Sequence, residues 1–393
     1  MKKKLLFLLL FVQLTLPLTT LADTITVNYI TYETNDTDMT ASITGYTVAP
    51  TGDLALPNTV SWIGGEYTVT SIGSSAFSYC SSLTAIDLPD SLTEIGSQAF
   101  SSCSSITEID FPDSLTEIGS YAFSSCSSLT SIDFPDSLTE IGERAFSYCS
   151  SLTAIDLPDS LTEIGYRAFH GCSSLTSVVL PESLTEIGSY AFYWCSSLTA
   201  IDFPESLKII GNQAFYYCTK LATVQFNESL VAIGVDAFYN CPGVTTSTLE
   251  GDGYTFQAIN NMATITGYQS TPFGEYTIPS TITVDENEYY VTSIYSSVFK
   301  ECTYITSLIL PEYLRYIDSS AFYGCTNLTS IDFPDSLTEI GIYAFGYCSS
   351  LTTIDLPDSL TEIGSSAFQS CTSLTAIDFP DSLTEIGYQA FYS

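Results

Sequence analysis

The sequence predicts a mainly β repeat solenoid built from stacked units of 23 residues. The first observation is that all twelve cysteines fall on one phase, from Cys80 to Cys241 and from Cys302 to Cys371, with every step 23 residues except one of 61. The second is an apolar pattern that recurs between the cysteines with few changes. Because a unit this short cannot bury its own apolar face, neighbouring units must stack into one continuous core.

Each unit contains two segments with strand character. Between Leu83 and Cys103 the chain reads LxxIxLPxxLxxIGxxAFxxC, and a short period that opens with LxxIxL is typical of a leucine-rich repeat. Residues 83–89 predict a strand that ends at a proline, and 91–96 a second strand, since Gly96 comes too early for a helix. AFxxC predicts a compact turn or a short 3₁₀ stretch. We expect a right-handed horseshoe or superhelix with a parallel concave sheet and short strands or 3₁₀ turns on the convex side.

The chain divides into a leader and two arrays. Residues 1–22 carry three lysines, an apolar run and small residues, which is the pattern of a signal peptide, and no transmembrane segment follows. The period stops after Cys241, where MATITGY and EYYVTSIYSSVF echo the earlier MTASITGY and EYTVTSIGSSAF. We predict a hairpin-like N-terminal cap at 23–70, a first array at 71–246, a second cap-like start unit at 247–293 and a second array at 294–393. The last array shows no evident closing cap, and its open edge could support self-association.

The composition excludes several classes of function. With 9 Lys+Arg against 44 Asp+Glu, the formal charge is −35, so the surface repels phosphate backbones and no nucleic-acid partner is expected. The single histidine, His170, has no HExxH motif around it, and phosphate-loop and GxSxG patterns are absent from the sequence. Carboxylate pairs recur in almost every repeat, whereas an active site would be built once. We therefore expect no enzyme activity, cofactor or metal site.

The cysteines admit two interpretations. An even number in a secreted protein often indicates disulfide bonds. Here each cysteine occupies the same inward position of its repeat, which favours a column of buried free thiols. The phenylalanines of the AFxxC segments should stack beside them as an internal spine.

The repeat signature, with the VTSIGSSAF and TITGY segments that precede the arrays, resembles the BspA-like (Treponema-type) leucine-rich repeat family of secreted and surface proteins. The resemblance covers nearly all of the chain after residue 22. It implies a secreted or extracellular, cell-surface location and a binding role without enzyme activity. Members of the family are associated with coaggregation, with contact with host cells and with adhesion to host extracellular-matrix proteins such as fibronectin and fibrinogen.

One candidate binding surface is acidic. The residue before the last apolar position of the first strand points away from the core, so its aspartates should form a file on the concave face. Such a file would attract a basic partner surface. The alternatives are a solvated face that discourages sheet aggregation and calcium shared between neighbouring carboxylates. The aspartates are Asp87, Asp110, Asp133, Asp156 and Asp202, with Asp332, Asp355 and Asp378 in the second array.

A second candidate surface is aromatic and lies within the first array. Tyrosine, tryptophan and arginine are common anchors of protein interfaces, although drift among near-identical repeats and shielding of the convex side are alternatives. We predict a protein–protein interaction in adhesion to host matrix or neighbouring cells. A self-assembling envelope or matrix protein and a glycan-binding solenoid are the competing hypotheses. The aromatic residues are Tyr190, Tyr193, Trp194, Tyr216, Tyr217 and Tyr239, and Arg144, Arg167, Lys208 and Lys220 lie in the same stretch.

Overall fold

The computed structural model of this chain describes residues 23–63, 65–227, 229–244 and 247–392. In these ranges the chain forms strands, turns and irregular connections without any α- or 3₁₀-helix. No helix in the described part could therefore cross a membrane. The predicted mainly β repeat solenoid is confirmed. The predicted signal peptide lies outside the described residues.

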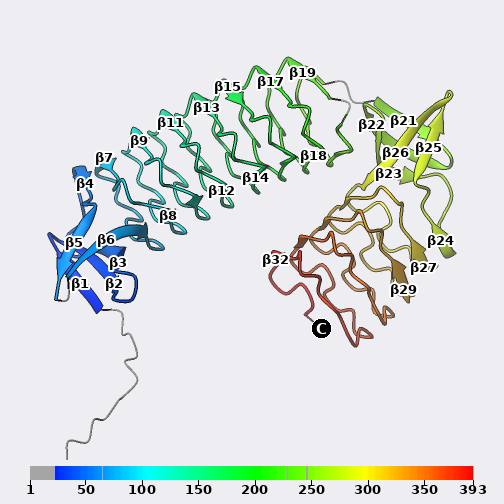
Figure 1. The fold of residues 1–393 in the computed structure, drawn as a ribbon. Coiled ribbons are helices and arrows are strands. Elements are labelled where there is room, and N and C mark those ends of the chain that lie inside the picture. The colour runs from blue at the N-terminus through cyan, green and yellow to red at the C-terminus, as the bar shows by residue number, and fades with distance from the viewer. Residues whose placement is uncertain (1–22, 64, 228, 245–246, 393) are drawn as a thin grey trace, which may run out of the picture.

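Two repeat arrays follow one another and fold back on each other (Figure 1). Each repeat contributes two short strands joined by tight turns. In most repeats one strand places an aspartate after a buried isoleucine, and the other places a glutamate before a buried isoleucine. We call the two resulting rows of strands the Asp ladder and the Glu ladder. The Glu ladders of the two arrays face each other, whereas the Asp ladders lie on the outer sides (Figure 1).

The strand bounds follow the 23-residue period. The Asp ladder of the first array comprises β7 (Leu83–Asp87), β9 (Glu108–Asp110), β11 (Ser131–Asp133), β13 (Ala154–Asp156), β15 (Ser177–Val179), β17 (Ala200–Asp202) and β19 (Thr223–Gln225). Its Glu ladder comprises β8 (Glu94–Ile95), β10 (Glu117–Ile118), β12 (Glu140–Ile141), β14 (Glu163–Ile164), β16 (Glu186–Ile187), β18 (Ile209–Ile210) and β20 (Ala232–Ile233). The second array has β27 (Ile305–Ile309) and β29 (Ser330–Asp332) opposite β28 (Tyr316–Ile317), β30 (Glu339–Ile340), β31 (Glu362–Ile363) and β32 (Glu385–Ile386).

Neighbouring repeats pair in parallel with a register of one repeat. Ile118 of β10 pairs with Ile95 of β8 on one side and with Ile141 of β12 on the other. The amide of Thr116 donates to the carbonyl of Thr93, 2.9 Å away. Because this register aligns identical residues, the isoleucines all point to the core and the neighbouring glutamates all point outward.

Each array begins with the same arrangement of longer strands. In both, three strands pair with one another antiparallel. A long strand then pairs in parallel with the third of them and continues into the Glu ladder, and a shorter strand pairs with this long strand as a hairpin. In the first these strands are β1 (Asp23–Val27), β2 (Ile30–Asn35), β3 (Thr40–Tyr46), β4 (Gly52–Ala55), β5 (Thr59–Trp62) and β6 (Gly65–Ile72). In the second they are β21 (Ser247–Gly251), β22 (Tyr254–Ile259), β23 (Met262–Tyr268), β24 (Gly274–Thr277), β25 (Thr281–Val284) and β26 (Asn287–Ile294).

The glycine after the Glu-ladder isoleucine is required by a close approach between repeats. A Cβ atom on Gly142 would lie 2.6 Å from the backbone nitrogen of Ser120, and one on Gly119 would lie 2.8 Å from that of Ser97. A larger residue at Gly119 or Gly142 would therefore push neighbouring repeats apart. Two repeats of the second array depart from this rule, with Tyr295 and Asp318 in the glycine position.

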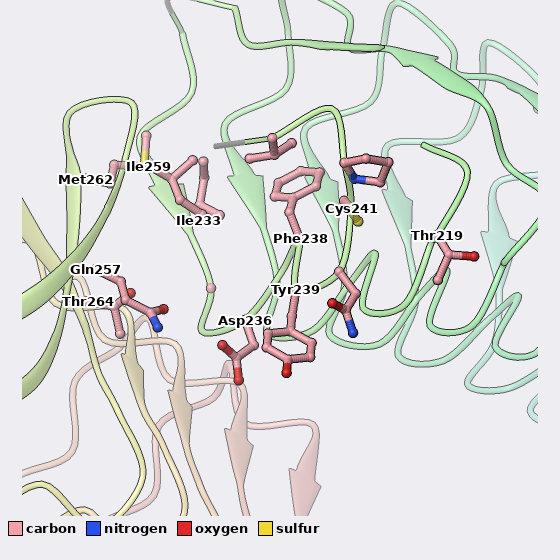
Figure 2. A pocket seen from close by; sticks show the side chains of 14 residues that line it. Thr219, Ile233, Asp236, Phe238, Tyr239, Cys241, Gln257, Ile259, Met262 and Thr264 are labelled. Carbon is pink, nitrogen blue, oxygen red and sulfur yellow. The ribbon is translucent and has the colours of Figure 1, made fainter. Parts of the chain in front are cut away.

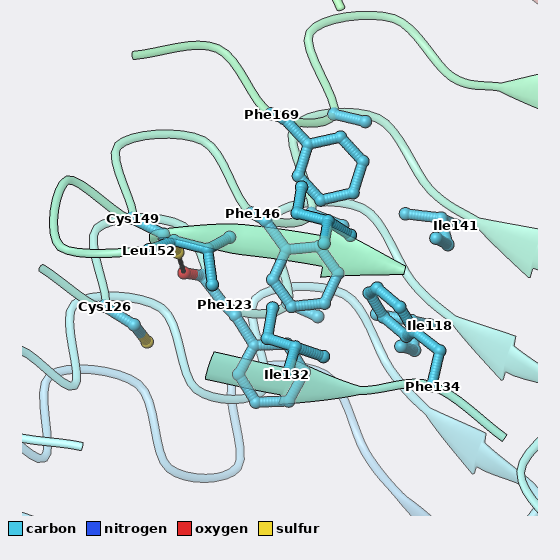
Figure 3. Close-up of a cluster of buried hydrophobic side chains, with 14 of the residues drawn as sticks. Ile118, Phe123, Cys126, Ile132, Phe134, Ile141, Phe146, Cys149, Leu152 and Phe169 are labelled. Atoms are coloured by element: carbon cyan, nitrogen blue, oxygen red, sulfur yellow. Dashed lines mark hydrogen bonds between the residues drawn. The ribbon is translucent and has the colours of Figure 1, made fainter. Parts of the chain in front are cut away.

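The core is a stack of phenylalanine rings (Figure 3). Consecutive AFxxC phenylalanines, as from Phe123 to Phe146 to Phe169, stack with centroids 5.1 to 5.6 Å apart and planes within 13° of parallel. Each array has its own stack, which begins on a tyrosine of the preceding start unit: Tyr46 on Phe77 and Tyr268 on Phe299. The predicted stacking of these rings is confirmed, but the expectation of one continuous core is wrong: the rings form two columns in two separate hydrophobic clusters, because the second start unit interrupts the period.

The twelve cysteines are buried free thiols, as predicted. Ten of the sulfurs face backbone carbonyls of the preceding repeat, and the Sγ of Cys149, for example, donates to the carbonyl of Phe123, 3.3 Å away (Figure 3). Burial raises the pKa of Cys103 and Cys172 to about 12. These side chains therefore act as small apolar groups that also satisfy a carbonyl.

Replacing one ring of the spine should leave a cavity that neighbouring repeats cannot close. We expect Phe146→Ala to lower the free energy of unfolding by about 3–5 kcal/mol, measured by urea denaturation. The matched control is Tyr79→Ala in the turn of another repeat. Tyr79 is 77% exposed, so we expect its loss to cost less than about 1 kcal/mol. Equal effects of the two substitutions would contradict the spine as the main source of stability.

The thiols should be unreactive until the chain unfolds, because the thiolate is the reactive form and burial disfavours it. We expect a thiol-specific colour reagent to detect almost no cysteine in the native protein. In denaturant without reductant the same reagent should detect all twelve. Fewer thiols in denaturant would mean that disulfide bonds had formed.

Candidate functional site

The predicted aspartates form an exposed file on the Asp ladder. Asp110 lies between Asp87 and Asp133 in the strand register, and the file is interrupted by Val179 and Gln225. Asp156, Asp202, Asp332, Asp355 and Asp378 are likewise exposed. The structure places this file on the side of the first array that faces away from the second (Figure 1). The side between the arrays carries the Glu ladders.

Most of the predicted aromatic residues meet in one continuous surface. His170, Tyr193, Tyr216 and Tyr239 stack in a column with ring centroids 4.9 Å apart at each step. A second row lies beside this column, with Trp194 5.5 Å from Tyr193 and Tyr217 4.8 Å from Tyr216. We call these residues, together with Tyr148, the aromatic surface. Trp194, Tyr239 and Tyr148 are each about half exposed.

The AFxxC turn explains how these large rings come to face solvent. The residue before each cysteine has a left-handed backbone, with φ of 61° at Tyr148, 60° at Trp194 and 59° at Tyr217. This conformation is costly for a non-glycine residue. Each of the three amides donates a backbone hydrogen bond of 2.7 to 2.8 Å to the next repeat, which offsets part of that cost. The turn thereby holds the side chains at fixed, regular positions.

A shallow groove runs across the outer row. It has a volume of about 420 Å³ and is lined by Tyr148, Gly171, Trp194 and Tyr217 with neighbouring Ser and Thr residues. Gly171 stands where most other repeats carry a side chain. A Cβ atom on Gly171 would lie 2.8 Å from the ring of Tyr148, so the glycine leaves room for that ring to fold into the gap.

Tyr148 and His170 are members of the surface that the sequence analysis did not assign to it. The Nε2 atom of His170 lies 3.1 Å from the hydroxyl of Tyr148. Burial, together with the nearby Arg167 and Arg144, lowers the pKa of His170 to about 4. The imidazole is therefore neutral at physiological pH and stacks as an aromatic ring. The signal was present in the sequence, since both residues occupy the variable positions of AFxxC.

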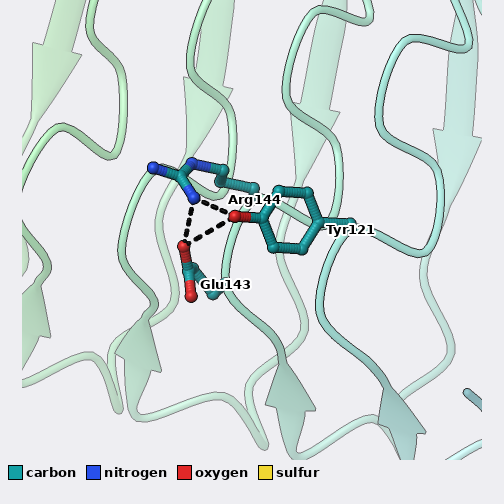
Figure 4. Close-up of polar contacts among 3 residues, drawn as sticks. All are labelled: Tyr121, Glu143 and Arg144. Atoms are coloured by element: carbon teal, nitrogen blue, oxygen red, sulfur yellow. Dashed lines mark hydrogen bonds and ion pairs between the residues drawn. The ribbon is translucent and has the colours of Figure 1, made fainter. Parts of the chain in front are cut away.

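Tyr190 lies in a different column, in which arginines alternate with tyrosines. The guanidinium of Arg167 lies 4.5 Å from the ring of Tyr190 and 4.9 Å from that of Tyr166. Arg144 lies between Tyr166 and Tyr121, 5.2 Å from each ring centre. It also pairs with Glu143 at 2.6 Å and donates to the hydroxyl of Tyr121 (Figure 4). Lys208 and Lys220 are exposed.

The junction between the arrays encloses a pocket (Figure 2). Its walls come from the last repeat of the first array, including Phe238 and Tyr239, and from Gln257, Met262 and Thr264 of the second start unit. Beside it, the hydroxyl of Tyr295 donates to Asp236 at 3.2 Å. The pocket thus lies at the contact between the last repeat of the first array and the start unit of the second array.

A second hollow between the arrays is acidic. This cleft, of about 710 Å³, is lined by glutamates from both Glu ladders and by Tyr166 and Tyr316. We call it the acidic cleft. Burial raises the pKa of Glu186 and Glu339 to about 7 and that of Glu362 to about 9, and neighbouring glutamates add to the rise. Its glutamates are Glu140, Glu143, Glu163 and Glu186 from the first array and Glu339, Glu362 and Glu385 from the second.

Comparison with known proteins identifies the family to which this chain belongs. Residues 58–166, 139–263 and 292–393 match the BspA type leucine rich repeat region, in six copies. The chain belongs to this family of leucine-rich repeat proteins. Among the described residues, no group of three or more His, Cys, Asp or Glu side chains is placed to hold a metal ion.

Several solved structures are similar. A leucine-rich repeat protein from Bacteroides ovatus is 31% identical, with a TM-score of 0.54 over 94% of this chain and 91% of that one. A leucine rich cell surface protein from Faecalibacterium prausnitzii is 30% identical, with a TM-score of 0.49 over 94% of this chain and 92% of that one. A leucine-rich repeat protein of Treponema pallidum is 30% identical, with a TM-score of 0.45, and covers 57% of this chain and 91% of that one. No curated protein matches by sequence.

The raised carboxyl pKa values predict that the arrays separate as the pH rises. The closed arrangement binds protons more tightly than free glutamates, whose usual pKa is 4.5. Its stabilisation is complete below that value, and it falls as the pH rises through about 7 for Glu186 and Glu339 and toward about 9 for Glu362. The charged groups that face these carboxyls are Glu163, Asp318, Glu385, Glu143, Arg144, Arg167 and Arg315.

Small-angle X-ray scattering measures this separation as an increase in the radius of gyration between about pH 5 and about pH 9. Glu339→Gln/Glu362→Gln should suppress the increase, because an amide carries no charge to repel the opposite wall. The control is Glu94→Gln/Glu117→Gln, two exposed glutamates of the same ladder outside the cleft. A radius that does not depend on pH in any variant would contradict the prediction.

Proposed function

We propose that this chain is a secreted or surface-exposed protein that binds a protein partner through its aromatic surface, in adhesion to host matrix or to neighbouring cells. The observation that carries this proposal is the column of stacked rings on consecutive turns of the first array, with the exposed rings of Trp194 and Tyr217 beside it. Rings held in fixed positions lose little conformational entropy on binding, and Trp and Tyr are frequent hot spots of protein interfaces.

The scaffold supports this role. A rigid solenoid presents an extended surface on which neighbouring repeats contribute equivalent positions. The groove beside Trp194 and Tyr217 gives a partner side chain a place to insert. The signal-like leader and the BspA type family favour secretion or surface exposure. We propose a binding role without catalysis.

The aspartate file contributes to the approach of the partner. Its exposed carboxylates are part of the formal charge of −35 that the chain carries. Such a field speeds association with basic surfaces and is screened by salt. We therefore assign short-range affinity to the aromatic surface and long-range attraction to the Asp ladder.

The test is binding of residues 23–393 to immobilised fibronectin, fibrinogen and control proteins. We expect Trp194→Ala/Tyr217→Ala to weaken saturable binding at least about tenfold, since each ring is an anchor. Asp110→Asn/Asp133→Asn/Asp156→Asn should instead reduce the association rate and flatten its dependence on salt. The matched control is Tyr79→Ala/Tyr347→Ala, which removes exposed rings at equivalent turn positions outside the aromatic surface.

The outcome decides between three functions. Loss in the Trp194 and Tyr217 variant alone supports the aromatic surface as the binding site. Equal loss in the control would show non-specific adhesion of exposed rings. Concentration-dependent self-association without binding to any matrix protein would favour a structural, self-assembling role, and binding on a glycan array with the same dependence on Trp194 would favour a glycan ligand.

A further inference from the structure

In the acidic cleft two rows of carboxyl groups face each other, and the nearby arginines are fewer than the glutamates. Glu140, Glu163 and Glu186 follow one another along the first Glu ladder, and Glu339, Glu362 and Glu385 follow one another along the second. Arg167 and Arg144 stand near the second row, and Arg315 stands near Glu186. Arg144 is already paired with Glu143. Like charges this close repel in a partly buried site, so ionised walls need further cations.

A second, independent feature points into the same cleft. Tyr316 occupies the glutamate position of its repeat and lies in register with Glu339, so its side chain projects on the cleft side of the ladder. The residue is only 2% exposed, yet its hydroxyl has no hydrogen-bond partner among the described residues. A buried hydroxyl without a partner is costly, and a bound ligand would supply one.

Specific contacts position the walls of the cleft. The hydroxyl of Ser189 in the first array donates to Glu339 of the second at 2.9 Å, and the amide of Asn212 donates to the same Ser189 hydroxyl at 3.1 Å. Tyr295 and Asp318, which replace the usual glycine, lie at this junction, where Tyr295 bonds to Asp236. The residues that depart from the repeat therefore gather where the arrays meet.

We propose that the acidic cleft binds a linear aliphatic polyamine, whose ammonium groups lie between the two glutamate rows and whose chain passes Tyr316. Successive glutamates along each ladder are separated by the strand spacing of about 4.8 Å, so the negative charge is spread along a line. A chain of ammonium groups joined by short methylene segments matches that distribution. Each ammonium offers three donors, enough to reach a carboxylate on each wall and the Tyr316 oxygen.

The shape of the cleft favours this ligand over the other cations that carboxylates attract. A divalent ion needs several oxygens converging on one point, whereas these carboxylates run along two facing rows. The volume of about 710 Å³ lies in the range of small-molecule sites. Tyr166, which is partly exposed and also lines the cleft, adds apolar surface for the methylene segments.

Isothermal titration calorimetry with spermine as the probe tests the proposal on residues 23–393 at neutral pH. We expect saturable binding with a stoichiometry near one. Glu163→Gln/Glu385→Gln should weaken it at least about tenfold, because it removes one carboxylate from each wall. Tyr316→Phe should weaken it several-fold through loss of one hydrogen bond. The matched control is again Glu94→Gln/Glu117→Gln, which changes the net charge equally outside the cleft.

Further titrations identify the ligand chemistry. Putrescine, with fewer ammonium groups, should bind at least about tenfold more weakly than spermine, and magnesium or calcium at equal ionic strength should not displace it. Circular dichroism confirms that the variants are folded. Equal weakening in cleft and control variants would overturn the proposal in favour of non-specific charge attraction. Tighter binding of a divalent ion or of a lysine-rich peptide than of spermine, or no saturable binding, would also overturn it.

Discussion

The parallel stacking of identical 23-residue units is the constraint on which the rest of this structure depends. Each repeat satisfies its backbone groups on its two neighbours, as when Phe123 donates to the carbonyl of Ala145 at 2.8 Å. Within each array the same register places each AFxxC ring on the next and most thiols against a carbonyl. Because no repeat can bury its apolar face alone, stability accumulates through these interfaces.

Strict stacking also determines where function can arise. A residue that recurs in each repeat becomes a row, such as the aspartates and the glutamates, and a row gives a surface its charge. A residue that departs from the repeat becomes a local feature. Trp194 is the one tryptophan at a turn position that faces solvent and that carries tyrosine, serine, glycine, asparagine or glutamate in the other repeats. Tyr316 replaces glutamate in a row that faces the other array, so the specific chemistry of this chain lies in its exceptions.

The two arrays convert rows into a site. Either Glu ladder alone would be a solvated acidic face of modest consequence. Facing each other across the acidic cleft, the same side chains are partly buried, and their carboxyl pKa values rise because burial and like charge both disfavour ionisation. Contacts such as Ser189 to Glu339 stabilise that arrangement. The glutamate rows therefore form a site only because the second array docks against the first.

The sequence by itself determined the repeat register, the inward positions of Phe146 and Cys149, the two start units and most of the aromatic surface, because a 23-residue period and the alternation of strand side chains are local properties. It did not determine which acidic row would line the space between the arrays. Ser189 and Glu339 are 150 residues apart, and their contact depends on how the second start unit docks on the last repeat of the first array. Only the tertiary structure decides that orientation, since a periodic sequence presents equivalent faces along its whole length and does not specify which of them will meet.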